Sequence, residues 1–321
     1  MENSLLSPFI LPDGQCDGPV LVTGAGGCIG AWVVAILSAS NIAVIAADLS
    51  DNRHRLELVM GKDAAEQVRW ATCDVTDYEA VLGLAKKHQI EAIIHLAGLQ
   101  VPFCAADPAL GARVNVEGTI NILQTAKDMG ITRTAYASSV AALALPPGGP
   151  FKETLYGVYK MANEQSAFVY WADWQVPSIG LRPNVVYGVA RDQGISSKNT
   201  LAIEAAVKKE PFIIPYTGNY SWLYAGEAAA AFIAAVSQHG EGASVFNLNG
   251  QCETIEAAIE IITSLAPDAD IRCEGTPFPF PPDLDEAPVR FQLPEYPAIS
   301  VTDGITATFN AFSALHETGT L

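Results

Sequence analysis

The chain has 321 residues, of which 50% are hydrophobic and 17% charged, so it can bury a large core in one or two α/β units. Its formal net charge of -17 gives no electrostatic attraction to nucleic-acid backbones or anionic membrane surfaces. We therefore expect no nucleic-acid or membrane partner, and an acidic enzyme that acts on a small molecule.

Residues 1–18 contain no Lys or Arg before a short apolar stretch that Pro8 and Pro12 interrupt, which predicts a loose leader and not a signal peptide. No apolar run reaches the roughly 18 residues of a membrane span. The cysteines show neither a CxxC pair nor metal-ligand spacing, as expected of buried thiols in a reducing compartment. They are Cys16, Cys28, Cys73, Cys104, Cys252 and Cys273. We predict a cytoplasmic location and a site without a metal.

Short apolar runs alternate with longer Ala-rich segments over the first 182 residues. The expected strands are 19–24, 42–48, 68–74, 91–98, 132–139 and 177–182. The expected helices are 28–40, a charged helix after residue 48, 78–88, 108–130 and 153–174. Strands that are apolar throughout and separated by helices predict a parallel sheet covered on both faces, the doubly wound or Rossmann fold of the α/β class.

After residue 182 the alternation gives way to turns rich in Gly, Pro and Asn. One further strand is expected at 243–250, a Pro-rich surface connection at 277–288 and a last helix at 301–316. We predict a leader (1–18), a Rossmann domain (19–182, taking in about 217–250) and a smaller substrate-binding region (183–216 and 251–321).

The stretch TGAGGCIG, residues 23–30, joins the first expected strand to the first expected helix. Gly24, Gly27 and Gly30 would let the backbone turn tightly and let a pyrophosphate reach the helix N-terminus, where free N–H groups favour anions. The spacing is GxxGxxG and not GxGxxG, although Gly26 is also small. The motif alone is therefore as compatible with a simple tight turn as with a dinucleotide site.

Asp48 ends the next expected strand, about 20 residues further on, where a carboxylate can accept hydrogen bonds from the adenosine ribose. Its alternative role is to cap the following helix. A carboxylate there also repels a 2′-phosphate, so we expect NAD in preference to NADP, although Arg53 and Arg55 lie nearby in the sequence.

Tyr156 and Lys160 in YGVYK lie one helical turn apart on the same face. A free tyrosine has a pKa of about 10, and a nearby ammonium or the positive nicotinamide of an oxidised cofactor would lower it. Such a pair is usually a coincidence of one helix face. Ser139, however, ends another strand at the carboxyl edge of the sheet, where ligands bind in such folds, so three side chains converge on one crevice.

Together these features resemble the extended short-chain dehydrogenase/reductase family, which includes nucleotide-sugar epimerases and dehydratases. The resemblance runs from Pro19 to about residue 250. Its motifs are TGAGGCIG, Asp48, CDVTD with Asp74, HLAG (95–98), NVEGT with Asn115, ASSV, YGVYKMANE and LRPNVVYG (181–188).

The resemblance implies a role for each matching position. Tyr156 would exchange a proton with a substrate hydroxyl, Lys160 would hold the nicotinamide ribose, and Ser139 would orient the substrate oxygen. Asn115 would support the active site, or equally brace a helix against a strand. The implied NAD-binding residues are Gly24, Gly27, Cys28, Ile29, Gly30, Asp48, Asp74, Val75, Leu96, Ala97, Gly98, Tyr156, Lys160, Pro183 and Val185. The family also implies a homodimer formed through the helices near 108–129 and 153–175.

The substrate pocket is expected beyond the nicotinamide. Its expected residues are Gln100, Ser139, Val140, Asn184 and Ser196, with Val101, Pro102, Phe103 and Ser197 as further candidates for its walls. For the loop residues, a place in an ordinary surface turn is the more frequent outcome. We interpret His95, at the end of an expected buried strand, as a packed and hydrogen-bonded side chain.

The chain departs from the nucleotide-sugar enzymes at two places. Val185 and Val186 precede Tyr187 where those enzymes carry an Asn, and Tyr220 and Ser221 replace an Arg-Asp pair. Without the guanidinium, bidentate recognition of a diphosphate is lost. We therefore expect a small substrate without a nucleotide: a sugar, sugar acid, polyol or similar secondary alcohol.

Three functions remain open on this basis. The first is an NAD-dependent oxidoreductase of the short-chain type, which transfers a hydride from a secondary alcohol. The second is an NAD-dependent sugar epimerase or dehydratase that uses the cofactor transiently. The third is a non-catalytic dinucleotide-sensing protein, against which the intact Ser139, Tyr156 and Lys160 argue.

Overall fold

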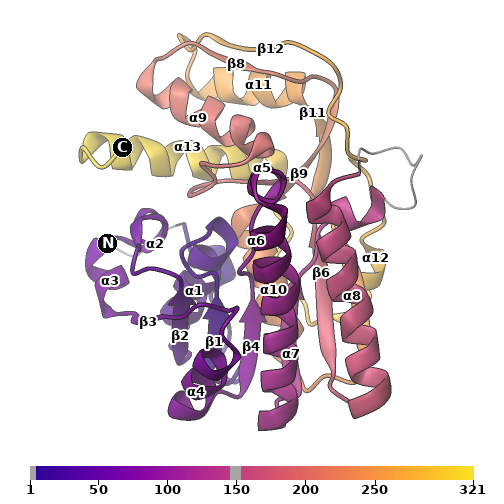
Figure 1. Cartoon of the computed structure of the whole chain (residues 1–321). Coiled ribbons are helices and arrows are strands. Elements are labelled where there is room, and N and C mark those ends of the chain that lie inside the picture. The colour runs from indigo at the N-terminus through magenta and orange to yellow at the C-terminus, as the bar shows by residue number, and fades with distance from the viewer. Residues whose placement is uncertain (1–4, 145–152) are drawn as a thin grey trace.

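The structure is a computed structural model that describes residues 5–144 and 153–321 (Figure 1), so the first four residues of the expected leader lie outside it. Seven strands form one parallel sheet in the order β10-β6-β5-β4-β1-β2-β3. Their bounds are β1 (Val20–Thr23), β2 (Val44–Asp48), β3 (Arg69–Thr72), β4 (Ala92–His95), β5 (Arg133–Ala137), β6 (Ser178–Pro183) and β10 (Ala243–Leu248). This sheet confirms the doubly wound fold.

Helices cover both faces of the sheet. They are α1 (Cys28–Ala39), α2 (His54–Met60), α3 (Lys62–Gln67), α4 (Tyr78–His88), α5 (Val101–Ala106), α6 (Pro108–Ala112), the π-helical turn η2 (Arg113–Glu117), α7 (Gly118–Met129), α8 (Leu155–Trp174) and α10 (Ala225–Val236). Val20 and Val22 of β1 belong to the core shared with α1 and α10, whereas Leu21 belongs to the core shared with α4 and α7. This alternation explains why the first three positions of β1 are all apolar.

The N-terminal segment is packed onto the domain, which differs from the loose leader that the sequence suggests. Leu6, Phe9 and Cys16 are buried. The ring of Phe9, in the short 3-10 turn η1 (Ser7–Phe9), lies 5.9 Å from Trp32 and 6.1 Å from Tyr224. A Cβ on Gly226 would sit 2.5 Å from the Phe9 ring, so glycine at that position makes room for it. Phe9 thus covers α1 and α10, whereas Ile10 is exposed.

Most of the remaining elements gather at one end of the sheet (Figure 1), whereas α12 (Ala287–Gln292) packs against β10. The elements at that end are β7 (Val186–Tyr187), η4 (Ile195–Ser197), α9 (Lys198–Lys208), β8 (Phe212–Ile214), β9 (Asn219–Tyr224), β11 (Gln251–Thr254), α11 (Ile255–Leu265), β12 (Ile271–Cys273) and α13 (Val301–Glu317). Strands β11, β9 and β7 form a small sheet, and β12 pairs with β8. The expected last strand and last helix correspond to β10 and α13. The division into domains stays a prediction.

Within the part of the chain that the structure describes, no helix combines the length and apolar character needed to cross a membrane. The cytoplasmic location stays a prediction.

Candidate functional site

A cavity of about 470 Å³ opens beside the Gly-rich turn after β1, at the carboxyl ends of β4, β5 and β6. Its wall continues through the start of α8 and the loop after β7 to the Pro-rich segment, which contributes Phe278, Pro279 and Phe280. Crevices at this edge of a doubly wound sheet are where ligands bind in such folds.

The Gly-rich turn has no space for side chains at its two ends. Gly24 has a φ of 71°, and a Cβ there would lie 2.5 Å from the Ala97 nitrogen. A Cβ on Gly30 would lie 2.1 Å from the carbonyl oxygen of Gly24. Gly27 precedes α1 without a side-chain cap, so the first N–H groups of the helix remain open to a ligand. This cradle fits a pyrophosphate, as the sequence predicts.

Asp48 lies against the same turn. Its Oδ2 accepts a hydrogen bond from the Gly26 nitrogen at 2.8 Å, and its Oδ1 accepts one from the Leu49 nitrogen at 2.7 Å. The two nearby arginines have other partners. Arg53 pairs with Asp51 at 2.7 Å and donates to three carbonyl groups, while Arg55 pairs with Asp192 at 2.8 Å. Neither guanidinium is a free partner for a 2′-phosphate.

Two of the expected NAD-binding residues, Asp74 and Val75, follow β3 and lie outside the cavity wall. Asp74 is exposed and accepts hydrogen bonds from the nitrogen and hydroxyl of Thr76. Val75 is buried, and a Cβ on Gly118 would meet its side chain at 2.8 Å. Of the expected NAD-binding residues, the cavity wall includes Gly24, Gly27, Cys28, Ile29, Gly30, Leu96, Gly98, Tyr156, Lys160, Pro183 and Val185. It does not include Asp48, Asp74, Val75 or Ala97.

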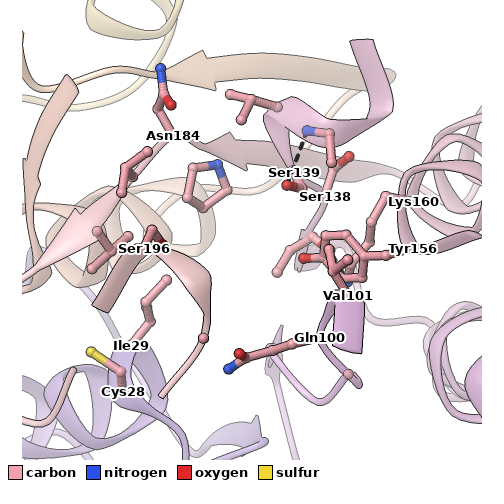
Figure 2. Close-up of a pocket in the computed structure, with 18 of the residues that line it drawn as sticks. Cys28, Ile29, Gln100, Val101, Ser138, Ser139, Tyr156, Lys160, Asn184 and Ser196 are labelled. Carbon is pink, nitrogen blue, oxygen red and sulfur yellow. Dashed lines mark hydrogen bonds between the residues drawn. The ribbon is translucent and has the colours of Figure 1, made fainter. Parts of the chain in front are cut away.

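Ser139, Tyr156 and Lys160 meet in the cavity, as the sequence predicts (Figure 2). The Lys160 Nζ donates to the carbonyl of Ala137 at 2.7 Å and lies 5.5 Å from the centre of the Tyr156 ring. Burial lowers the pKa of Lys160 to about 8. Burial raises the pKa of Tyr156, whereas hydrogen bonding to Ser139 and the charge of Arg191 act in the opposite direction.

This raised pKa differs from the expectation that Lys160 makes Tyr156 more acidic. The reason is that the phenol is withdrawn from water while the ammonium is hydrogen-bonded to Ala137. The same expectation included the positive charge of the nicotinamide. That charge can lower the pKa of Tyr156 only when the oxidised cofactor is bound.

Asn115 lies in the π-helical turn η2 and is fully buried. Its Nδ2 donates to the carbonyls of Leu99 at 3.2 Å and Gly111 at 3.0 Å, which braces the helix against the loop after β4. Its Oδ1 has no hydrogen-bond partner among the described residues. A Cβ on Gly98 would lie 2.7 Å from this oxygen and 3.4 Å from Lys160 Nζ, so the two polar groups face the same point.

His95 is the packed side chain that the sequence suggests. Its Nδ1 lies 2.7 Å from the Thr23 hydroxyl, and its Nε2 lies 3.2 Å from the Thr119 hydroxyl. Since Thr119 donates its own proton to the Asn115 carbonyl, Nε2 is assigned as the protonated nitrogen. Burial lowers the pKa of His95 to about 3, so the ring is neutral.

The expected substrate residues all line the cavity: Gln100, Ser139, Val140, Asn184 and Ser196, together with Val101 and Pro102. Two further candidates do not. Phe103 is 51% exposed, and the Ser197 hydroxyl donates to the Gly194 carbonyl inside its own turn.

Sequence reasoning missed part of the wall. The Pro-rich segment, expected as a surface connection, closes one side of the cavity with Phe278 and Phe280. Asn184 holds it in place by donating to the Pro281 carbonyl at 2.8 Å. Arg191 is the other missed residue, and an isolated cation shortly after the strand motif LRPNVVYG was the available signal.

Tyr220, which stands where a diphosphate-binding Arg is expected, is buried. Its ring stacks on Tyr216 at 5.5 Å and contacts Phe278 at 4.9 Å. An aromatic cluster therefore occupies the place of the guanidinium.

Residues 20–248 match the NAD dependent epimerase/dehydratase family. A UDP-glucose 4-epimerase from Mycolicibacterium smegmatis is 26% identical over 91% of this chain and 97% of its own length. Two solved structures share the fold. A UDP-glucose 4-epimerase from Thermotoga maritima, with UDP-glucose, has a TM-score of 0.78 at 20% identity, over 92% of this chain and 99% of that chain. A partial consensus L-threonine 3-dehydrogenase has a TM-score of 0.77 at 21% identity, over 92% and 99%.

The fold agrees with these comparisons. A further similar structure, the UDP-glucose 4-epimerase of Thermus thermophilus, was solved in complex with NAD; its TM-score is 0.71 at 22% identity, over 91% of this chain and 98% of that chain. These matches confirm NAD as the predicted cofactor. The chain is thus an extended short-chain dehydrogenase/reductase and belongs to the NAD dependent epimerase/dehydratase family.

Proposed function

We propose that this protein is an NAD-dependent oxidoreductase that oxidises a secondary hydroxyl of a small substrate without a nucleotide. The observation that carries the proposal is the meeting of Ser139, Tyr156 and Lys160 in one cavity beside the Gly-rich turn. A protein that only senses a dinucleotide needs no proton-transfer group at this place.

The cofactor would be held by the Gly-rich turn and the N-terminus of α1 at its pyrophosphate, and by Asp48 at its adenosine ribose. Lys160 has three N–H donors, so it can keep its bond to Ala137 and still donate to the nicotinamide ribose. When bound, the cofactor supplies the hydride acceptor.

The residues of the chain handle the proton. Tyr156, as the phenolate, accepts the hydrogen of the substrate hydroxyl, and Ser139 donates a hydrogen bond to the alkoxide-like oxygen that develops. The hydride leaves the carbon that bears this hydroxyl, so the secondary alcohol becomes a ketone. The hydroxyl proton is released through Tyr156. Desolvation keeps the phenol neutral in the free protein, and the positive charges of Arg191 and of the oxidised nicotinamide favour the phenolate.

The small substrate is supported by the aromatic cluster around Tyr220. Phe278 belongs both to this cluster and to the cavity wall, so aromatic rings stand at the position where the nucleotide-sugar enzymes carry their diphosphate-binding Arg. The substrate should therefore be a sugar, sugar acid, polyol or similar alcohol.

The test is a panel of sugars, sugar acids and polyols incubated with the protein and NAD. NADH absorbance and the organic products are measured together. Formation of one NADH for each substrate consumed supports the proposal.

The alternative is an epimerase or dehydratase that returns the hydride to its substrate. The similarity to UDP-glucose 4-epimerase along nearly the whole chain favours it. The same panel, extended with UDP-glucose, separates the two functions: a changed product without accumulating NADH supports the alternative, whereas binding of NAD without any product indicates a sensing protein.

Substitution of Asp48 tests the cofactor preference. In Asp48→Asn the amide oxygen can still accept the Gly26 N–H, but the charge that repels a 2′-phosphate is gone. We expect the ratio of kcat/KM with NAD to kcat/KM with NADP to fall by about tenfold, equivalent to about 1.4 kcal/mol. Asp63→Asn is the matched control, because Asp63 is an exposed carboxylate in the first turn of α3. Equal ratios in the two variants would remove Asp48 from cofactor selection.

A homodimer is proposed through the outer faces of α7 and α8. These helices expose Ile120, Val158, Phe168 and Val169, which is an unusual amount of apolar surface for helices of an acidic protein. We expect light scattering to give twice the chain mass of 34.0 kDa, and Val169→Glu to give the single mass. Ile213→Glu, at an equally exposed apolar residue of β8, should leave the dimer intact. A wild-type monomer at micromolar concentration would contradict the proposal.

A further inference from the structure

The cavity is positively charged although the chain as a whole is strongly acidic. Among the described residues that form its wall, the charged side chains are Lys160 and Arg191, and none is an Asp or Glu. The chain carries a formal net charge of -17. A positively charged pocket in an acidic protein favours an anionic ligand over a neutral or cationic one.

Arg191 has unused hydrogen-bonding capacity. Its Nη2 donates to the Ser196 hydroxyl at 3.0 Å, while its Nε is buried without a hydrogen-bond partner in the described residues. Within residues 5–144 and 153–321, no carboxylate lies at ion-pair distance from it; the adjacent Asp192 is paired with Arg55 at 2.8 Å. A partly buried guanidinium without a counter-ion is costly unless a ligand supplies one.

Other polar side chains surround the same place. A Cβ on Gly194 would lie 2.7 Å from the Gln100 Oε1 and 3.2 Å from Arg191 Nη2, so these two side chains meet over the glycine. The Ser196 hydroxyl accepts from Arg191 and keeps its own proton to donate. In Figure 2, Ser196 and Tyr156 lie on opposite sides of the open centre of the cavity.

We propose that the substrate carries a carboxylate that binds Arg191, with Ser196 as a further donor, while its secondary hydroxyl faces Tyr156 and Ser139. The substrate class is therefore a small hydroxy acid, and the assignment rests on the proposed oxidoreductase function. One guanidinium matches the single charge of a carboxylate and can bind it in a bidentate manner. Neutral sugars and polyols would leave Arg191 without a counter-ion.

The competing anion is the cofactor's own pyrophosphate, because the charge of Arg191 also acts on Cys28 at the start of α1. Two observations favour the substrate. The N–H groups of α1 and the Gly-rich turn already provide a pyrophosphate cradle, and the bond that Arg191 makes is to Ser196, not to that turn.

The experiment compares small hydroxy acids with their primary amides: glycerate, 3-hydroxybutyrate and L-threonine, each with its amide and NAD. The amide has nearly the same shape and the same hydroxyl but lacks the carboxylate charge. For the best acid, we expect kcat/KM of the wild type to exceed that of its amide by at least about tenfold. Arg191→Met should lower this ratio to near one, and Arg191→Lys should keep part of it. Arg272→Met, which removes an exposed arginine paired with Asp270 outside the cavity wall, should leave the ratio unchanged.

Binding measurements separate this inference from the proposed function. Calorimetry with the NAD-loaded Tyr156→Phe variant, with and without Arg191→Met, reports carboxylate binding without turnover. Binding of an acid that requires Arg191 supports the inference even if no oxidation is found. The inference is overturned if the wild type oxidises the amides or neutral polyols as well as the acids, if no acid binds, or if Arg191→Met weakens NAD affinity and leaves the acid-to-amide ratio unchanged.

Discussion

Tyr156→Phe is expected to lower kcat by about 10²- to 10⁴-fold, because it removes the oxygen that accepts the substrate proton and leaves the ring in place. NAD affinity, measured by calorimetry, should change little, since Lys160 and the Gly-rich turn remain. In the wild type, kcat/KM for alcohol oxidation should rise with pH as the phenol is deprotonated. In the variant this rise should be absent.

Tyr159→Phe is the matched control for this prediction. Tyr159 lies on the same helix α8 but outside the cavity wall, where its hydroxyl donates to the Pro108 carbonyl at 2.8 Å. Its loss should leave kcat within about threefold of the wild type. If both variants turned over at the wild-type rate, Tyr156 would not be the proton acceptor, and the oxidoreductase mechanism proposed above would be wrong.

The sequence predicted those parts of the site that depend on local structure. Gly24 has a positive φ of 71°, and a Cβ on Gly30 would meet the carbonyl of nearby Gly24, so both positions favour glycine for local reasons that are visible as a motif. Tyr156 and Lys160 share a face because helical geometry places residues i and i+4 together. Ser139 could be added because parallel strands end at one edge of the sheet.

The parts that the sequence did not predict depend on contacts between distant segments. Phe278 belongs to the wall because the Pro-rich segment is held by Asn184, 97 positions away. Phe9 is buried because Gly226 leaves room for its ring. The lack of a partner for Arg191 likewise becomes visible only when the fold shows that Asp192 pairs with Arg55. None of these contacts between distant residues leaves a recognisable motif in the sequence around either residue.

Glu164→Ala is expected to lower the free energy of unfolding by about 3–5 kcal/mol, which makes it the most destabilising single change among those considered. The Glu164 side chain is 1% exposed and binds Arg182 through both oxygens, at 2.7 and 2.6 Å. It also accepts a hydrogen bond from Ser138, which lines the cavity next to Ser139. The alanine variant would leave a guanidinium and a buried hydroxyl without their acceptor, and urea unfolding measures the cost.

Glu204→Ala is the control variant, because it removes an ion pair that is partly exposed and not buried. Glu204 and Lys208 form a partly exposed pair one turn apart at 2.5 Å, which should contribute no more than about 0.5 kcal/mol. A second comparison identifies the cause. If the cost of Glu164→Ala arises from the unpaired Arg182, the double variant Glu164→Leu with Arg182→Met should be more stable than Glu164→Ala alone, since no charge is then left buried. A double variant less stable than Glu164→Ala would show instead that the ion pair itself holds the ends of β5 and β6 together, and with them the serines of the cavity.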